Sequence, residues 1–193
     1  NKIKGLDAII YTHEHADQTS GIFEMRPFYW KNKKKIPVYA SKRTINILKN
    51  NHTFCFIPKH GYKPIMKLFP IKNNFKIKKN KTIISIEAFN VTHGMINATG
   101  YLFDKIAYLS DCNNIPKNSM KLLKGLNFLI IDCLRKKKHP SHFNYDEAIE
   151  MINILKPKKA ILTNLHTDLD YNYLKKKLPS NIIPAHDGLK FNF

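Results

Sequence analysis

Two histidines and an aspartate stand close together near the start of this chain, at His13, His15 and Asp17. They follow an apolar run at residues 6–11 that is typical of a buried strand. Imidazole nitrogens and a carboxylate oxygen at a strand end are the donors of a catalytic Zn²⁺, Mn²⁺ or Fe²⁺ site, with positions left open for water. The spacing therefore predicts a metal site, and a loop that is merely polar is the simpler alternative.

Three later residues of the same chemical kinds each follow an expected strand. They are His93, Asp111 and His166. An isolated histidine is more often solvated or capped than a metal ligand, so each residue is a weak signal by itself. Strand ends that share one edge of a sheet would bring the three together. The set then supplies two imidazoles and a carboxylate that can bridge two metal ions.

Strands and helices alternate along the sequence, without an internal repeat or a linker, which predicts one mixed α/β domain. Strands are expected at 36–40, within 66–109, and at 128–133, 160–163, 182–183 and 189–193. A short helix is expected at 20–28, ending near Pro27, another after residue 40 and a lysine-rich one after residue 163. Residues 51–64 show no clear period and contain Pro and Gly, so we expect a loop there.

The clearest helix signal begins at Asn144. Glu147 follows at the position that completes a capping box, in which each side chain bonds the other residue's backbone N–H. Apolar residues then recur on one face, and Pro157 ends the pattern.

The chain has 193 residues and carries 33 Lys and Arg against 14 Asp and Glu, a net charge of +19. Hydrophobic residues make up 43%, which is enough for a packed core. Such a charge is typical of a nucleic-acid partner. The lysines are spread along the chain, however, whereas a dedicated groove is more often rich in Arg interleaved with aromatics. We therefore favour an exposed-lysine surface over a polyanion site, and a nucleic-acid partner stays open without being favoured.

The three cysteines, Cys55, Cys112 and Cys133, are scattered and predict reduced thiols in a cytoplasmic protein. No apolar run approaches the roughly 20 residues that a membrane span needs, so no membrane partner is expected. The sequence leaves open whether the chain forms a homodimer.

The motifs and their order resemble those of the metallo-β-lactamase-fold hydrolases over essentially the whole chain. Residues 11–17 (Tyr-Thr-His-Glu-His-Ala-Asp) are similar to the family's HxHxDH signature, and the later histidines and aspartate match its single-residue ligand motifs. The resemblance implies an αββα sandwich and one or two divalent metal ions, Zn²⁺ or Mn²⁺. It implies that the first ion is held by His13, His15 and His93, with Asp111 bridging, and the second by Asp17, His166 and residue 18.

The stretches 110–116 and 139–144 look most like the branch that contains phosphoribosyl cyclic phosphate phosphodiesterases. By that resemblance the chain hydrolyses a small phosphodiester, which can be cyclic, through a metal-bound hydroxide. Asp111 would position the hydroxide and Asp17 orient it, while His142 protonates the leaving oxygen. The alternative for His142 is an exposed histidine beside lysines. Asn164 or Thr163 is expected to support His166 without contacting the metal.

Position 18 departs from the family signature, which ends in His where this chain has Gln18. An amide oxygen is a poorer donor than imidazole toward a borderline metal. The second ion is therefore expected to bind weakly, or the chain has lost its activity.

Two other functions stay open. One is an RNA-processing nuclease of the same fold, which the charge suits, although the sequence lacks a long Gly-rich inserted arm. The other is a truncated remnant that is weakly active or inactive and binds polyanions non-specifically. The family's HxHxD loop follows several strands, whereas here it begins at residue 13. The resemblance thus implies that residues 1–193 are the C-terminal majority of a single domain, N-terminally incomplete.

Overall fold

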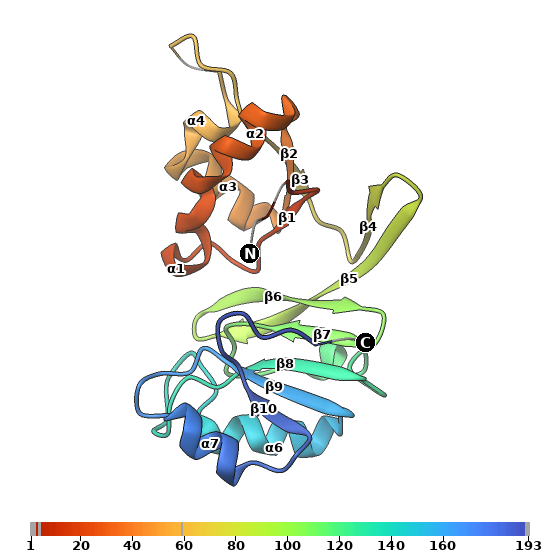
Figure 1. Cartoon of the computed structure of the whole chain (residues 1–193), viewed down its shortest axis with the longest axis vertical. Coiled ribbons are helices and arrows are strands. Elements are labelled where there is room, and N and C mark those ends of the chain that lie inside the picture. Colours follow the sequence, from red (N-terminus) through yellow and green to blue (C-terminus); the bar gives the residue numbers. More distant parts are fainter. Residues whose placement is uncertain (1–2, 4, 59, 192–193) are drawn as a thin grey trace. The chain divides into compact units, whose positions relative to one another are not determined.

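The computed structural model describes residues 3, 5–58 and 60–191, and Figure 1 labels their helices and strands. Strands and helices alternate along the chain, so the predicted mixed α/β class is confirmed. The chain divides into two compact units, Asn1–Ser85 and Ile86–Phe193, with the boundary inside the long strand β5 (Thr82–His93). The expected single domain over 1–193 stays a prediction.

The first unit is built on a small parallel sheet in the order β1–β2–β3. Its strands are β1 (Ile9–Ile10), β2 (Ile36–Ala40) and β3 (Met66–Pro70). Its helical segments are α1 (Ala16–Thr19), the 3₁₀ helix η1 (Ser20–Met25), α2 (Arg26–Asn32), α3 (Lys42–Asn51) and α4 (Thr53–Phe56). Both α3 and α4 contact β3, and the apolar side chains between helices and sheet form a core around Val38, Leu48 and Met66.

Two expectations for this unit are wrong. Pro27 does not end a helix but lies in the first turn of α2. Backbone N–H groups in the first turn have no carbonyl partner within the helix, so the lack of an N–H in proline costs no helical hydrogen bond there. The expected loop at 51–64 contains the short helix α4. Its Cys55 is fully buried in the core, and this packing leaves no periodic pattern in the sequence that could have predicted the helix. The strand expected at 6–11 is confirmed only at β1.

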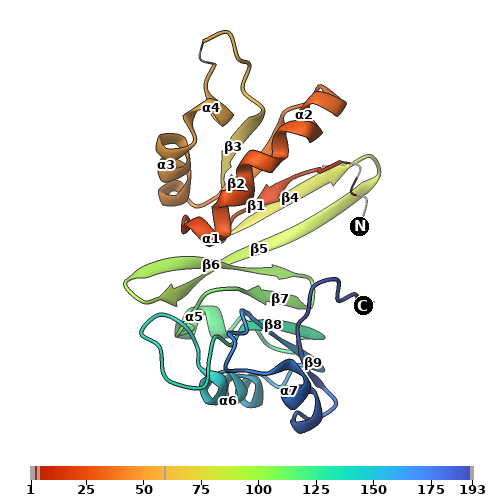
Figure 2. The same cartoon turned by 60° about the vertical axis from the view of Figure 1, so that its left-hand side comes forward.

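The larger sheet has the strand order β10–β9–β8–β7–β6–β5–β4. Besides β5, its strands are β4 (Asn74–Lys79), β6 (Ile96–Phe103), β7 (Ile106–Leu109), β8 (Phe128–Asp132), β9 (Lys159–Thr163) and β10 (Ile182–Pro184). The helices of the second unit are α5 (Lys117–Met120), α6 (Tyr145–Leu155) and α7 (Tyr171–Lys177). Helix α6 lies against β8 and α7 against β10, as Figures 1 and 2 show from two sides.

Most expected elements of this unit are confirmed. Strands β8, β9 and β10 fall where continuous apolar runs predicted them, as buried parallel strands do. Both bonds of the capping box at Asn144 are present, and α6 ends at Lys156 in a left-handed conformation. The strand expected at 189–193 is absent over 189–191, and residues 192–193 lie outside the described part of the chain.

The pairing of these strands determines where their ends lie. Strands β7, β8 and β9 are mutually parallel, so their carboxyl ends lie at one edge of the sheet. Strand β5 reaches β7 through two antiparallel pairings and therefore runs in the same direction as β7. Residues that follow these four strands consequently gather at a single edge. None of the described helices is long and apolar enough to cross a membrane.

Candidate metal centre

Three side chains that can ligate a metal meet at this edge of the sheet. They are His93 at the end of β5, Asp111 just after β7 and His142 on the loop before α6, and their ligand atoms lie within 4.8 Å of one another. His93 and Asp111 are buried, and His142 is mostly buried. With Asp132 and Asn164, described below, we call these residues the sheet-edge cluster.

His93 is fixed in the tautomer that a metal ligand needs. Its Nδ1 donates a hydrogen bond to the Ser141 carbonyl oxygen at 2.7 Å, so in the neutral ring the lone pair is on Nε2. That Nε2 lies 3.9 Å from Asp111 Oδ2. An ion about 2.0–2.2 Å from each atom can bridge this separation. The two donors therefore fit a divalent metal.

Asp132, which the sequence analysis did not single out, fixes the ring of His142. The His142 Nδ1 donates to Asp132 Oδ2 at 2.7 Å, and Asp132 is completely buried at the end of β8. Burial raises the pKa of Asp132, while the hydrogen bond and charge of His142 and the N–H of Cys112 oppose that rise. The sequence did carry a signal for Asp132, because it is a carboxylate at the end of an apolar strand, much as Asp111 follows β7.

Asn164 holds both carboxylates of the cluster. Its Nδ2 donates to Asp111 Oδ1 at 2.9 Å and to Asp132 Oδ1 at 3.2 Å, and it also lies 3.2 Å from the Ser110 carbonyl oxygen. The residue stands after β9 with a left-handed φ of 60°. Support of His166 by Asn164 or Thr163 stays a prediction, and the bonds of the Asn164 side chain orient Asp111 and Asp132.

The loop at 139–142 is held against the end of β5 by a close backbone approach. Asn113 accepts a bond from the Gly94 N–H at 2.9 Å and donates to the Pro140 carbonyl at 3.2 Å. Gly94 has a φ of +59°, and a Cβ there would lie 2.9 Å from the Ser141 Cβ. Glycine therefore lets this loop approach His93 closely enough for Ser141 to bond it.

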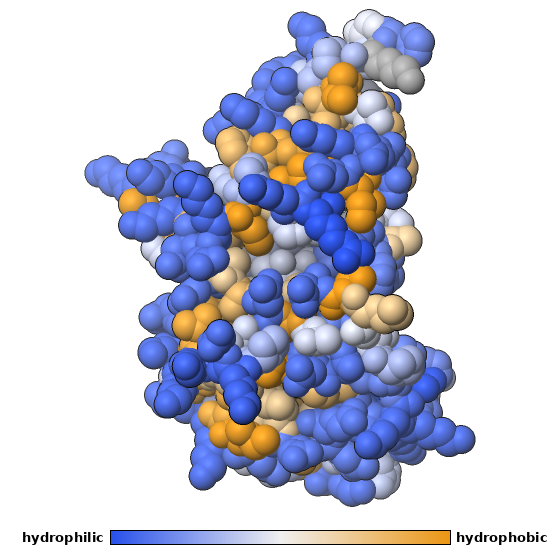
Figure 3. All heavy atoms as spheres, turned by 180° about the vertical axis from the view of Figure 1, so that it is seen from behind, coloured by the Kyte–Doolittle hydropathy of each residue, from blue (hydrophilic) through white to orange (hydrophobic). Residues whose placement is uncertain are grey.

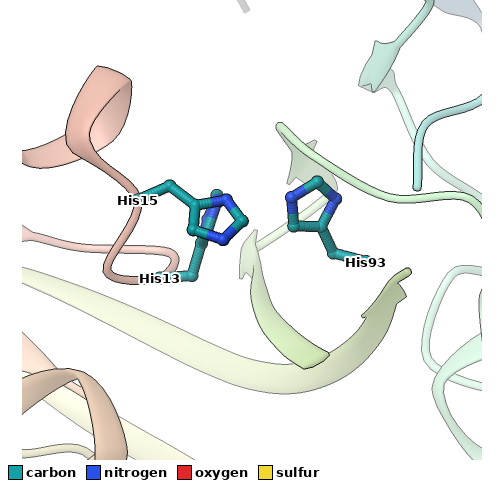
Figure 4. Close-up of side chains that lie close together, drawn as sticks. All are labelled: His13, His15 and His93. Atoms are coloured by element: carbon teal, nitrogen blue, oxygen red, sulfur yellow. The ribbon is translucent and has the colours of Figure 1, made fainter. Parts of the chain in front are cut away.

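The His13 and His15 rings lie edge to face on the loop after β1, with their centroids 4.6 Å apart. Figure 4 shows these two side chains and also draws His93 at the end of β5. The His13 Nε2 and His15 Nδ1 atoms are 3.0 Å apart, so one of these two nitrogens donates a hydrogen to the other. A divalent ion can take the place of that shared hydrogen. We call residues 12–18 the ligand loop.

Asp17 and Gln18 follow in α1, the short helix Ala16–Thr19. The Gln18 side-chain N–H donates to Asp17 Oδ2 at 3.1 Å. Burial would raise the pKa of Asp17, but the Gln18 bond, the backbone N–H and the charges of His13 and His15 together lower it. Asp17 is therefore an exposed carboxylate that stays ionised at neutral pH.

Glu14, a second residue that the sequence analysis missed, ties the ligand loop to α3. Its carboxylate pairs with Arg43 Nε at 2.8 Å and accepts a bond from Thr44 Oγ1 at 3.0 Å. Only 7% of the Glu14 side chain is exposed. No local pattern reveals this contact, because the partners stand about 30 positions away in sequence.

His166 is exposed and its Nδ1 lies 3.4 Å from Asp168 Oδ1. Among the described residues it does not join the group of His93, Asp111 and His142.

The three cysteines are buried and form no disulfide. Burial raises the pKa of Cys55 to about 11, that of Cys133 to about 12 and that of Cys112 as well, so these thiols are protonated and inert.

The family described as "Beta-lactamase superfamily domain" matches residues 1–164. The chain belongs to this family. It is similar to the crystal structure of a new diphosphatase from the PhnP family, with 32% identity, a TM-score of 0.87, and coverage of 99% of this chain and 73% of that one. The predicted metallo-β-lactamase fold, near the PhnP-like branch, is therefore confirmed, and hydrolases of this fold bind divalent metals.

Two curated relatives are also similar. An octanoyltransferase of Porphyromonas gingivalis is 29% identical over 97% of this chain, which spans only 38% of that relative's length. The exodeoxyribonuclease YycJ of Bacillus anthracis is 24% identical, with 88% of this chain and 67% of the relative covered.

Proposed function

We propose that this chain is a metal-dependent phosphodiesterase that hydrolyses a small phosphodiester, cyclic ones included. The observation that carries the proposal is the pair formed by His142 and Asp132, set beside His93 and Asp111 at the sheet edge. Similarity to a PhnP-family diphosphatase supports phosphate chemistry. The octanoyltransferase does not contribute to the proposal, because this chain spans only 38% of its length.

The proposed ligands follow the family resemblance. One ion would be held by His13, His15 and His93, with Asp111 bridging, and a second by Asp17 and His166, with Gln18 as a weak ligand. The imidazole and carboxylate donors suit Zn²⁺ or Mn²⁺. When bound, such ions supply Lewis acidity toward phosphoryl oxygens and acidify water.

The side chains of the sheet-edge cluster would handle the proton of the reaction. Because Nδ1 of His142 donates to Asp132, Nε2 is the nitrogen that exchanges a proton with the leaving oxygen. His139 is less suited, since burial and the nearby charges of His142, Arg135 and His93 lower its pKa. Asn164 keeps the Asp111 carboxylate in one orientation. The ionised Asp17 would orient the attacking water.

An RNA-processing nuclease is the second candidate. The net charge of +19 suits a polyanionic substrate such as RNA, and the similarity to an exodeoxyribonuclease supports nuclease chemistry without pointing to RNA. Such an enzyme would use the same ligands on a larger substrate. A cytoplasmic location stays a prediction, and a homodimer stays an open possibility.

Hydrolysis assays with three substrates test the proposal. The protein is stripped with a chelator, reloaded with Zn²⁺ or Mn²⁺, and given bis(p-nitrophenyl) phosphate, a cyclic nucleotide phosphate or a tRNA precursor. We expect turnover of the two small diesters with either metal and none in the stripped protein. Cleavage of the precursor alone would favour the nuclease. No turnover of any substrate by protein that holds metal would contradict both functions and favour the inactive remnant.

A further inference from the structure

An open pocket of about 570 Å³ lies within the first unit, and none of its lining residues is among the proposed metal ligands. Its walls come from α2, from Phe54 of α4 and from residues 60–65. The volume is in the range of sites that take small molecules. The proposed hydrolysis does not account for this pocket.

Aromatic rings form one part of its wall. Trp30 is 57% exposed and Tyr62 is 70% exposed, and Tyr29 lies beside Trp30 in sequence. Phe54 completes the set and stacks on Phe23 at 5.4 Å between ring centroids. Trp30 and Tyr62 are the exposed rings of this wall and offer faces on which a planar ligand can stack, while Tyr29 and Phe54 also pack against the core.

Positive charge forms the other part. The Arg26 guanidinium lies 5.8 Å from the Trp30 ring centroid and 5.6 Å from that of Phe54. Lys33 and Lys63 also line the pocket, and no Asp or Glu is among its described lining residues. The pocket therefore carries at least three positive charges without a neighbouring carboxylate in its wall.

Arg26 is one of three arginines in a chain that is otherwise rich in lysine. Arg43 is paired with Glu14, and Arg135 bonds the backbone carbonyls of Lys137 and Lys138. Arg26 instead lies over aromatic rings. Hydrophilic residues predominate on the face drawn in Figure 3. Against a surface of dispersed lysines, this pocket combines arginine with aromatics, which is the composition of a nucleotide-binding surface.

We propose that this pocket binds a nucleotide, with the base stacked on the exposed rings and the phosphate held by Arg26 and the lysines. A bare polyanion would not need the aromatic rings, and an apolar peptide would not need the cations. The nucleotide is either free or one unit of a single strand, since both present the same base and phosphate. The site is a binding site and takes no part in the proposed hydrolysis.

Trp30 is the only tryptophan of the chain, so its fluorescence reports on this pocket directly. The full chain is titrated with AMP and, separately, with a short single-stranded oligoadenylate, in the presence of a chelator. Excitation at the red edge of indole absorption avoids interference from adenine. We expect saturable quenching. Quenching by AMP and by the oligonucleotide, or by either one, supports the proposal and identifies the source of the nucleotide.

Two variants and two matched controls locate the binding. Tyr62→Ala removes an exposed stacking ring, and we expect binding roughly tenfold weaker. Lys63→Gln removes one charge and should also weaken binding and reduce its salt dependence. Tyr173→Ala and Lys49→Gln change exposed residues outside the pocket and should bind within about twofold of the parent protein.

Three results would overturn the proposal: no saturable quenching, quenching by inorganic phosphate or polyphosphate equal to that by AMP, or wild-type binding by Tyr62→Ala. The chelator removes metal ions, so hydrolysis plays no part in the titration. Failure here would leave the proposed phosphodiesterase untouched, and an inactive enzyme would leave the nucleotide site untouched.

Discussion

The sheet-edge cluster and the ligand loop supply similar donors but are built differently. In the cluster, His93 is bonded to Ser141, His142 to Asp132, and Asn164 to two carboxylates, and each bond joins different segments of the second unit. In the ligand loop, the bonds between His13 and His15 and between Gln18 and Asp17 join near neighbours in sequence. The side chains of His15 and Asp17 are also exposed.

This difference separates two roles. A cluster braced from several strands holds its donors, and the histidine that we propose as proton donor, in one geometry before any ligand arrives, which is what catalysis requires. A loop in which two donors are exposed, His15 and Asp17, depends more on the bound ion for its final arrangement. Substitution of His142 should therefore change the chemistry. Substitutions in the ligand loop, and those that loosen His93, should change metal affinity.

The largest effect is expected for His142→Ala. Without the proton donor, turnover of a diester with a poor alcohol leaving group should fall about 10²–10⁴-fold. Turnover of bis(p-nitrophenyl) phosphate should fall far less, because p-nitrophenolate leaves without protonation. Steady-state rates on both substrates, with metal content measured on the same samples, check this prediction.

The geometry offers a rival role for His142, since its ligand atom lies close to those of His93 and Asp111. If His142 is a metal ligand, the variant will lose metal and both substrates will slow together. Equal losses with reduced metal would thus contradict the general-acid assignment. Unchanged turnover of the poor-leaving-group diester would exclude both roles.

Gly94→Ala should weaken the bracing of the cluster. An alanine at a φ of +59° is strained, and its Cβ would press on Ser141, which holds His93. We expect a loss of about 1–2 kcal/mol in the free energy of unfolding and metal affinity lower by about 10–100-fold. Urea unfolding and a competitive metal titration measure the two effects.

Gly21→Ala is the matched control, because a Cβ there meets nothing within 4 Å. It should leave metal affinity unchanged. Equal metal affinity in the Gly94 variant and the parent protein would show that the loop at 139–142 does not position His93.

The sequence predicted the elements of the sheet-edge cluster better than its internal contacts. Apolar runs located β8 and β9, and the capping box located α6, because these signals are local. The contact of Asp132 with His142 depends on how a loop folds back over a strand end, which no spacing encodes. Likewise, α4 is stabilised by tertiary packing around the buried Cys55, and no periodic pattern of apolar residues marks it in the sequence.

The ligand loop shows the same limit. Its histidines and aspartate were recognisable from type and spacing, since all lie within a few residues of one another. The role of Glu14 was not, because its partners Arg43 and Thr44 come from a helix far along the chain. The expected metal ligand set as a whole stays a prediction.

Glu14→Gln tests whether the ligand loop needs its tie to α3. The amide loses the ion pair with Arg43, so His13 and His15 should be held less firmly and metal affinity should fall about tenfold. The free energy of unfolding should fall by about 1 kcal/mol, because Glu14 is largely buried although Arg43 is half exposed. Glu24→Gln, at an exposed position of the same unit, is the control for a lost negative charge. Equal affinity in both variants would mean that α3 does not steady the loop.

The smallest effect, and the only gain, is expected for Gln18→His. An imidazole at this position restores the family's donor, so the second ion should bind severalfold more tightly. Metal ions per chain, measured against free metal concentration, report the change. Gln18→Leu is the matched control, because it removes the bond to Asp17 without adding a donor. If the parent protein already holds two tightly bound ions and Gln18→His does not change their affinity, the amide of Gln18 is an adequate ligand. The ligand loop then does not bind metal more weakly than the sheet-edge cluster.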